Sequence, residues 1–155
     1  MSVTYTNEVK TNVLDPLKDL MFTEFRPIDV VFEKKFDGSW MKRGEYIRYW
    51  LIDSSEVGKN SDGETRDYDI EIVFYFDTRR HRTKTAFDDV YSDRAEHLKR
   101  LLDNYNYYDD GTYRWTELTI ETDQVQPVSE LEEDVDIEET MAYRFLVTIR
   151  RSNFR

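Results

Sequence analysis

The most constraining feature of this sequence is a period-two alternation of side chains over residues 66–77. From residue 68 onward, the even-numbered positions carry bulky apolar side chains, which are Tyr68, Ile70, Ile72, Phe74 and Phe76. The odd-numbered positions are mostly acidic and include Asp67, Asp69 and Glu71. Because successive side chains of a strand point to opposite faces, the pattern predicts a strand with one buried face and one wetter face.

Other segments predict the elements around this strand. Further strands are expected over residues 29–36, 45–53, 113–123 and 141–151, with a turn at Asp37-Gly38 and a polar loop over residues 54–63. Apolar residues at helical spacing predict a helix over residues 86–105. An N-terminal helical segment is expected within residues 1–27, broken at Asp15 because Pro16 follows.

The order of these elements predicts an α+β fold, with a single mostly antiparallel β-sheet and helices packed on one face. The loops between the strands near 29–53 and 113–151 are too short for crossover helices, which favours antiparallel pairing. The length of 155 residues predicts a single domain over residues 1–155. The aromatic content of 15% argues against a disordered chain.

Charge and composition exclude several classes of function. The formal net charge of −11 opposes nucleic-acid binding by the chain as a whole, because phosphate contacts need a surface of Lys and Arg. The chain has no cysteine, which rules out disulfides, Cys-type zinc sites and a Cys nucleophile. No apolar run is long enough to span a membrane, and the N-terminus lacks the pattern of a secretory signal.

No strong catalytic motif is present, so we expect no enzymatic activity, no metal and no cofactor. Asp67, Asp69 and Glu71 have the spacing to hold Mg²⁺ or Ca²⁺ on one strand face. The alternative is that Arg or Lys from neighbouring strands meets their charges. Glu33 and Lys35 match a short fragment of some metal-dependent nucleases, a match that is frequent by chance. Residues 53–64 are a near miss for a calcium loop, and a flexible hairpin loop fits them better.

Two charged segments are candidates for docking. The first is a basic loop, which could contact an acidic partner or a neighbouring subunit; its candidate residues are Arg79, Arg80, His81, Arg82 and Lys84. The second is an acidic connector over residues 130–139, which could be an exposed loop or an acidic lumen surface; its candidates are Glu130, Glu132, Glu133, Asp134, Asp136, Glu138 and Glu139. Each could also be a plain solvated connector.

Three segments together resemble the tail terminator proteins of long-tailed bacteriophages, the gpU-like or tail-completion group. Residues 63–76 (GETRDYDIEIVFYF) look like that family's central strand, and residues 92–102 (SDRAEHLKRLL) look like the helix that follows it. The run from Trp115 through residues 141–151 (MAYRFLVTIRR) supplies a strand, an acidic connector and a last strand ending in Arg. The resemblance covers residues 5–151 in element order and texture, without a diagnostic motif.

The resemblance implies a structural protein of the virion at the tail–neck junction, assembled in the cytoplasm of a host bacterium. Proteins of this group form hexameric rings that cap the tail tube and join it to the head or neck. The implied partners are other copies of the chain, the tail tube protein and a neck or head-completion protein. DNA passes through the lumen without specific binding. An acidic lumen suits that passage.

Three other functions remain open from the residues alone. The chain could be a neck or head–tail connector protein, or a tail tube protein, which would need matching head and tail surfaces in order to polymerise. It could be a metal-dependent enzyme that uses Asp67, Asp69 and Glu71. It could also be a small acidic binding domain that sequesters a basic partner.

Overall fold

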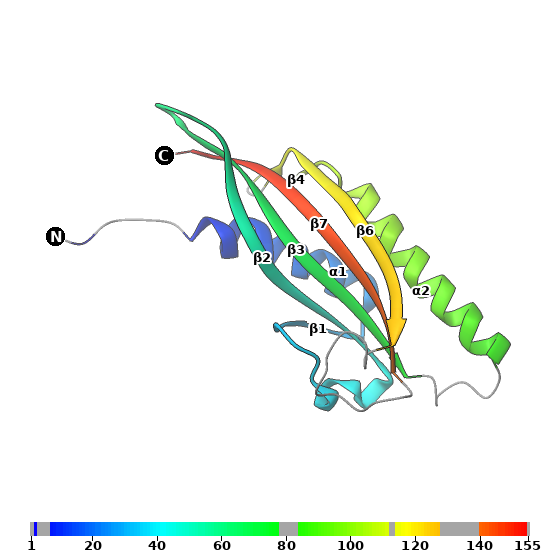
Figure 1. The fold of residues 1–155 in the computed structure, drawn as a ribbon. Coiled ribbons are helices and arrows are strands. Elements are labelled where there is room, and N and C mark those ends of the chain that lie inside the picture. The colour runs from blue at the N-terminus through cyan, green and yellow to red at the C-terminus, as the bar shows by residue number, and fades with distance from the viewer. Residues whose placement is uncertain (1, 3–6, 78–83, 112–113, 128–139, 155) are drawn as a thin grey trace.

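A five-stranded sheet forms the centre of the computed structural model, which describes residues 2, 7–77, 84–111, 114–127 and 140–154 (Figure 1). Its strand order is β1-β2-β3-β7-β6. The strands are β1 (Asp29–Phe32), β2 (Glu45–Asn60), β3 (Gly63–Asp77), β6 (Glu117–Pro127) and β7 (Thr140–Phe154). All neighbours in the sheet pair antiparallel except β1 and β2. The predicted α+β class with a mostly antiparallel sheet is confirmed.

The core lies between one face of the sheet and two helices, α1 (Asp15–Phe25) and α2 (Lys84–Asn104). The even-numbered apolar side chains of β3 all point into this core, as the alternation predicts. They meet Leu17 and Met21 from α1 and Leu98 and Leu102 from α2. Burial of this apolar area is the main stabilising contribution to the fold.

The expected break at Asp15 is wrong, because helical turns continue from residue 8 to residue 25. A π-helical turn, η1 (Lys10–Leu14), leads directly into α1. In this turn the amide of Asp15 donates to the carbonyl oxygen of Lys10. Pro16 then occupies the first turn of α1, where its missing N–H costs little. The widened turn therefore accommodates the proline without interrupting the helix.

The expected polar loop over residues 54–63 is also wrong. β2 runs on to Asn60 and β3 begins at Gly63, so most of that segment forms the end of a long antiparallel hairpin. Polar side chains suit this part of the hairpin because it projects past the helices into solvent (Figure 1). The calcium-loop alternative fails for the same reason, since its residues lie on paired strands.

β1 is shorter than expected and pairs parallel to β2, against the expectation of antiparallel pairing at this point. The connection between them contains a 3₁₀ helix, η2 (Gly38–Arg43), that the sequence did not predict. Phe36, Trp40 and Met41 from this connection cover one end of the second face of the sheet. η2 ends at Gly44, whose φ of 78° is a left-handed conformation that favours glycine. A short 3₁₀ segment therefore replaces the crossover helix of a usual parallel pair.

The predicted strand over residues 113–123 consists of two pieces, β5 (Arg114–Trp115) and β6. β5 pairs with β4 (Tyr108–Asp109) in a separate small ribbon that follows α2. The fully buried Trp115 donates its Nε1–H to the carbonyl oxygen of Tyr105 at 2.8 Å. This bond fixes the end of α2 against the start of β6.

Candidate assembly surfaces

The sheet face opposite α1 and α2, called here the open face, carries an array of charged and hydroxyl side chains. Its acidic residues on β3 and their partners on β7 are Asp67, Asp69, Glu71, Arg144, Thr148 and Arg150. Arg150 donates Nε–H and Nη2–H to the two Asp67 carboxylate oxygens at 2.8 and 3.1 Å. The Thr148 hydroxyl donates to Asp69 at 2.8 Å. Each carboxylate of the row therefore has a donor on the adjacent strand.

Glu71 is the centre of the most buried charge cluster on this face. Its two carboxylate oxygens lie 2.7 Å from Nη1 of Arg48 and 2.6 Å from Nε of Arg144. Arg48 is 2% exposed, and its Nε–H also donates to the hydroxyl oxygen of Tyr75 at 2.9 Å. Burial alone lowers the pKa of Arg48, but Tyr75 and Glu71 more than offset this, so the pKa lies above its ordinary value.

These contacts bear directly on the metal-site alternative. Asp67 and Glu71 are met by arginines of neighbouring strands, as the competing interpretation predicted, whereas Asp69 accepts from the hydroxyl of Thr148. Within the part of the chain that the structure describes, no group of three or more His, Cys, Asp or Glu side chains is arranged to hold a metal ion. Glu33 follows the end of β1 and accepts a hydrogen bond from Nε1 of Trp40, so Glu33 and Lys35 do not share a strand face.

The outer edge of β2 is the first of two unlike sheet edges. β1 pairs only with residues 46–49 of β2, which leaves the edge from Trp50 to Asn60 without a neighbouring strand among the described residues. The pairing of β2 with β3 shifts register twice along this stretch, at Ile52 and at Val57. These two bulged residues are 51% and 48% exposed. The edge therefore presents two aliphatic side chains to solvent.

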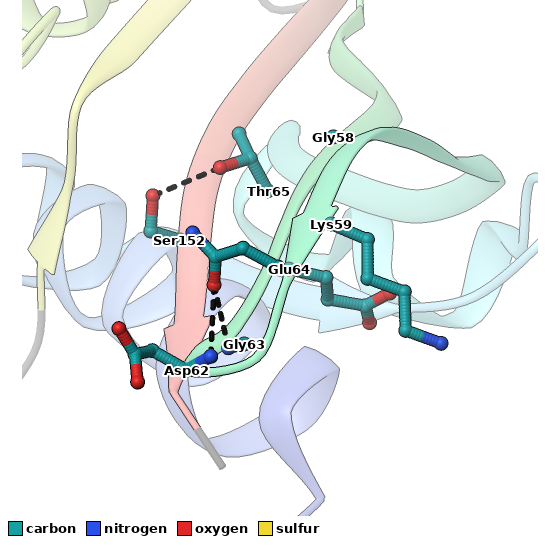
Figure 2. Close-up of a pocket in the computed structure, with 8 residues that line it drawn as sticks. Gly58, Lys59, Asp62, Gly63, Glu64, Thr65 and Ser152 are labelled. Carbon is teal, nitrogen blue, oxygen red and sulfur yellow. Dashed lines mark hydrogen bonds between the residues drawn. The ribbon is translucent and has the colours of Figure 1, made fainter.

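The tip of the same hairpin is a tight two-residue turn (Figure 2). Oδ1 of Asn60 accepts from the amides of Asp62 and Gly63 at 2.9 and 3.1 Å. The hydroxyls of Thr65 and Ser152 lie 3.1 Å apart and join the hairpin to β7. A shallow hollow of about 280 Å³ lies beside these residues. The projecting hairpin is therefore held in shape by its own hydrogen bonds.

A groove lies beside the opposite edge of the sheet, which is formed by β6. It runs between the end of α2 and β6 and has a volume of about 640 Å³. Its lining includes Lys99, Asp103, Tyr107, Leu118, Ile120 and Asp123. The amide of Leu118 donates to the carbonyl oxygen of Asn106 at 2.7 Å, which ties the start of β6 to the turn after α2. The groove walls are therefore joined by the backbone itself.

The predicted docking residues fall largely outside the described residues. Arg79, Arg80, His81 and Arg82 lie there, and so do all the candidates of the 130–139 connector. Lys84 begins α2, but its side chain is among those not described. The structure does describe the residues at which the two segments join the sheet, called here their anchors. Asp77, before the basic loop, pairs in register with Thr140, after the acidic connector. Both segments therefore leave the sheet at the same end.

His97 lies on α2 as a partly exposed residue. Its Nε2 lies 2.7 Å from Oε1 of Glu24, and its ring packs against Phe25. The residue links α2 to α1.

Sequence reasoning missed both sheet edges. A signal was present for one of them, because Val57 is a lone aliphatic residue in an otherwise polar stretch. No single sequence pattern indicated the groove, because its lining comes from two different elements, α2 and β6. Among the helices of the described residues, none combines the length and the apolar character needed to cross a membrane.

Comparison with known proteins found matches only among solved structures. No protein-family model and no curated protein matches the chain. A chain from the virion of a native gene transfer agent particle aligns with 94% of this chain and 90% of its own length, at 11% identity and a TM-score of 0.46.

A second match comes from an extracellular contractile injection system, described as the PVC sheath/tube terminator in its extended state. It aligns with all of this chain at 11% identity and a TM-score of 0.49. This chain spans 59% of the length of that terminator chain. Because both TM-scores lie below 0.5, neither likeness assigns a function to the chain.

Proposed function

We propose that this chain is a structural tail protein, a terminator whose copies form a hexameric ring that caps a tail tube and joins it to the head or neck. The observation that carries the proposal is the sheet itself. One face is sealed by helices, the other is a polar surface whose charges are neutralised largely within the sheet, and the two edges are unlike. A subunit of this kind can be repeated around an axis with the same face turned inward each time.

The open face is suited to line a passage for DNA. Between Arg48 and Ser55 of β2, the sheet has four rows of cross-strand partners whose side chains lie on this face. Their five carboxylates are those of Asp53, Asp67, Asp69, Glu71 and Glu117. The same rows carry three guanidinium groups, which are those of Arg48, Arg144 and Arg150. The arginines are engaged by carboxylates of the same sheet, so they are poorly available to phosphate. The resulting acidic excess repels a passing polyanion.

The charged segments at one end of the sheet are proposed to meet the partners. The basic loop, with Arg79, Arg80, His81, Arg82 and Lys84, docks on a neighbouring copy or on the tube or neck protein. The acidic connector over residues 130–139 borders the lumen or the neck. Their anchors, Asp77 and Thr140, are register partners, which supports a common role for this end of the molecule.

Capping in this proposal is geometric and involves no bond chemistry. One end of the ring matches the last ring of tube subunits. The other end does not reproduce that surface, so no further tube subunit can add.

Native mass spectrometry with negative-stain imaging of the same sample tests the ring. Six copies of the 18.8 kDa chain make about 113 kDa. A closed ring at that mass, together with tubes whose growth stops when the chain is added, supports the terminator. A ring that never arrests tube growth points to a connector elsewhere in the neck, and long tubes point to a tube protein.

The double charge reversal Arg79→Glu/Arg82→Glu tests the docking loop. The chain should remain folded by circular dichroism but lose assembly. If the double variant assembles and caps tubes normally, the basic loop is only a connector. Turnover that is lost in Asp69→Asn would instead reveal an enzyme, and tight binding of a basic peptide by a monomer would indicate an acidic binding domain.

A further inference from the structure

The groove between α2 and β6 has an acidic lining, and this charge indicates what kind of partner it takes. Asp103 of α2 and Glu117 and Asp123 of β6 line the groove, against the single cation Lys99. None of these four side chains forms an ion pair with another described residue. Three carboxylates against one lysine leave the lining with a net charge of −2 that the described part of the fold does not neutralise.

The hydroxyl of Tyr143, beside the groove, responds to this charge. It donates a hydrogen bond to Oδ2 of Asp123 at 2.8 Å. Burial raises the pKa of Tyr143 to about 12, with further contributions from the hydrogen bond and charge of Asp123 and from the charge of Glu96 on α2. Carboxylates of both walls therefore act on the same place, as expected for a groove with a negative potential.

The same groove offers apolar contacts between its charges. Ile120 is partly exposed in the lining, and Tyr107 has 58% of its surface exposed. Lysine and arginine side chains suit this mixture, because their aliphatic stems pack on apolar surface while their charged ends reach carboxylates. An aromatic ring such as that of Tyr107 also attracts a cation. The lining therefore matches cationic side chains better than acidic or purely apolar ones.

The strand β6 sets the length of the groove and the way in which a partner can be held. From Glu117 to Asp123 the strand is about 20 Å long at ~3.3 Å per residue, which suits about six extended residues. Addition of a new strand to the outer backbone of β6 is opposed at two points. The amide of Leu118 already donates to Asn106, and the register of β6 against β7 shifts at Glu121. The side chains of a partner must therefore supply most of the contact.

We infer that the groove between α2 and β6 binds an extended, lysine- or arginine-bearing segment of another protein, whose cationic ends pair with Asp103, Glu117 and Asp123. A nucleic acid is a poor occupant, because phosphates are repelled by these carboxylates and by the net charge of −11. Opposite charges across the groove favour encounter and select basic segments over neutral ones. The groove lies within one copy, so the inference goes beyond the proposed ring and applies to a single chain as well.

Fluorescence anisotropy with labelled octapeptides tests the inference. A peptide that alternates lysine and alanine should bind the chain, and one that alternates glutamate and alanine should not. Asp103→Asn/Asp123→Asn should weaken binding of the lysine peptide about tenfold, because two cation partners are lost while the new amide oxygen can still accept from Tyr143. Lys99→Gln should strengthen binding about threefold, because it removes the one opposing charge of the lining.

Glu56→Gln/Asp62→Asn is the matched control, since it removes the same charge from exposed positions of the β2–β3 hairpin. It should bind the lysine peptide as the wild type does. Equal weakening in the two double variants would mean attraction to the overall net charge and overturns the site. A wild-type chain that does not bind the lysine peptide, or a Lys99→Gln variant that binds it no better, also overturns it. Spermine that displaces the peptide at equal total charge assigns the groove to a small polycation instead.

Circular dichroism checks that the variants fold, and ring formation and arrest of tube growth are measured on the same samples. Rings that arrest tubes but bind no lysine peptide overturn this inference and leave the proposed function intact. A chain that binds the peptide in the groove but forms no rings and arrests no tubes overturns the proposed function alone, and is then an acidic binding domain. Rings that the lysine peptide takes apart would show that a second copy occupies the groove, which overturns the inference of a different partner.

Discussion

Arg48 and Glu71 form an ion pair of 2.7 Å across β2 and β3, on the open face of the sheet. Arg48 is almost fully buried there because Trp40 and Met41 of η2, together with Phe36, pack over the adjacent aromatic residues Tyr46 and Tyr75. The pair also joins Arg144 of β7, so one carboxylate ties three neighbouring strands together.

Removing that carboxylate should destabilise the fold strongly. Glu71→Ala leaves the buried guanidinium of Arg48 without its anion, and the expected loss is about 3 kcal/mol in the free energy of unfolding. Urea denaturation followed by circular dichroism measures it. Asp69→Asn is the matched control on the same strand face, because an amide oxygen can still accept from Thr148, and it should cost less than about 1 kcal/mol. Equal losses in the two variants would contradict the special role of Glu71.

Trp115 should be the critical tryptophan of the three. Trp115→Phe removes the hydrogen bond to Tyr105 and leaves a cavity in the core, for an expected cost of about 2 kcal/mol. The thermal midpoint should fall accordingly in calorimetry. Trp50→Phe should change stability much less, because Trp50 is half-buried and stacks on an exposed Phe32. A larger loss from Trp50→Phe would mean that the β2 edge, and not the α2–β6 junction, limits stability.

Assembly should strengthen as salt is added. Each copy carries a net charge of −11, so copies that approach one another repel. Raising the ionic strength from about 0.1 M to about 1 M shortens the screening length from roughly 10 to 3 Å, while apolar contacts between copies are not screened. Sedimentation velocity at several NaCl concentrations should show a growing oligomer fraction. Weakening with salt would indicate an interface held mainly by ion pairs.

The fold should lose stability in alkali between about pH 10 and 12. Burial raises the pKa of Tyr49 to about 12. Burial, aided by the hydrogen bond to Asp123, does the same for Tyr143. An unfolded chain releases these protons near pH 10, so over this window the folded state binds more protons and stability falls as pH rises. The last part of the rise in phenolate absorbance, from the buried tyrosines, should coincide with the loss of circular dichroism. Complete ionisation of all tyrosines in a chain that is still folded would contradict this coupling.

The longest periodic segments were predictable from the sequence. The alternating strand around Tyr68 to Phe76, the helix α2 and the final strand were all predicted from the sequence, because their patterns extend over several turns or pleats. The expectation that arginines of neighbouring strands meet the acidic row holds for Asp67 and Glu71 but not for Asp69, whose donor is Thr148. Local periodicity encodes which face of an element is buried, and that information needs no knowledge of the partners.

The tertiary structure alone decided the extent of the hairpin, the parallel pairing of β1 and the unlike edges. Polar residues such as Ser54 and Lys59 have no strand signature of their own; pairing with β3 holds them extended. The helix continues through Pro16 because the turn that precedes it, η1, is a wider π-helical turn. The groove lies between two separate elements, α2 and β6, and the register between Asp77 and Thr140 brings two charged segments to one end. Such features depend on contacts between elements, which a local sequence pattern does not encode. The sequence by itself therefore determined which face of each element is buried, and the tertiary structure determined the surfaces available for assembly.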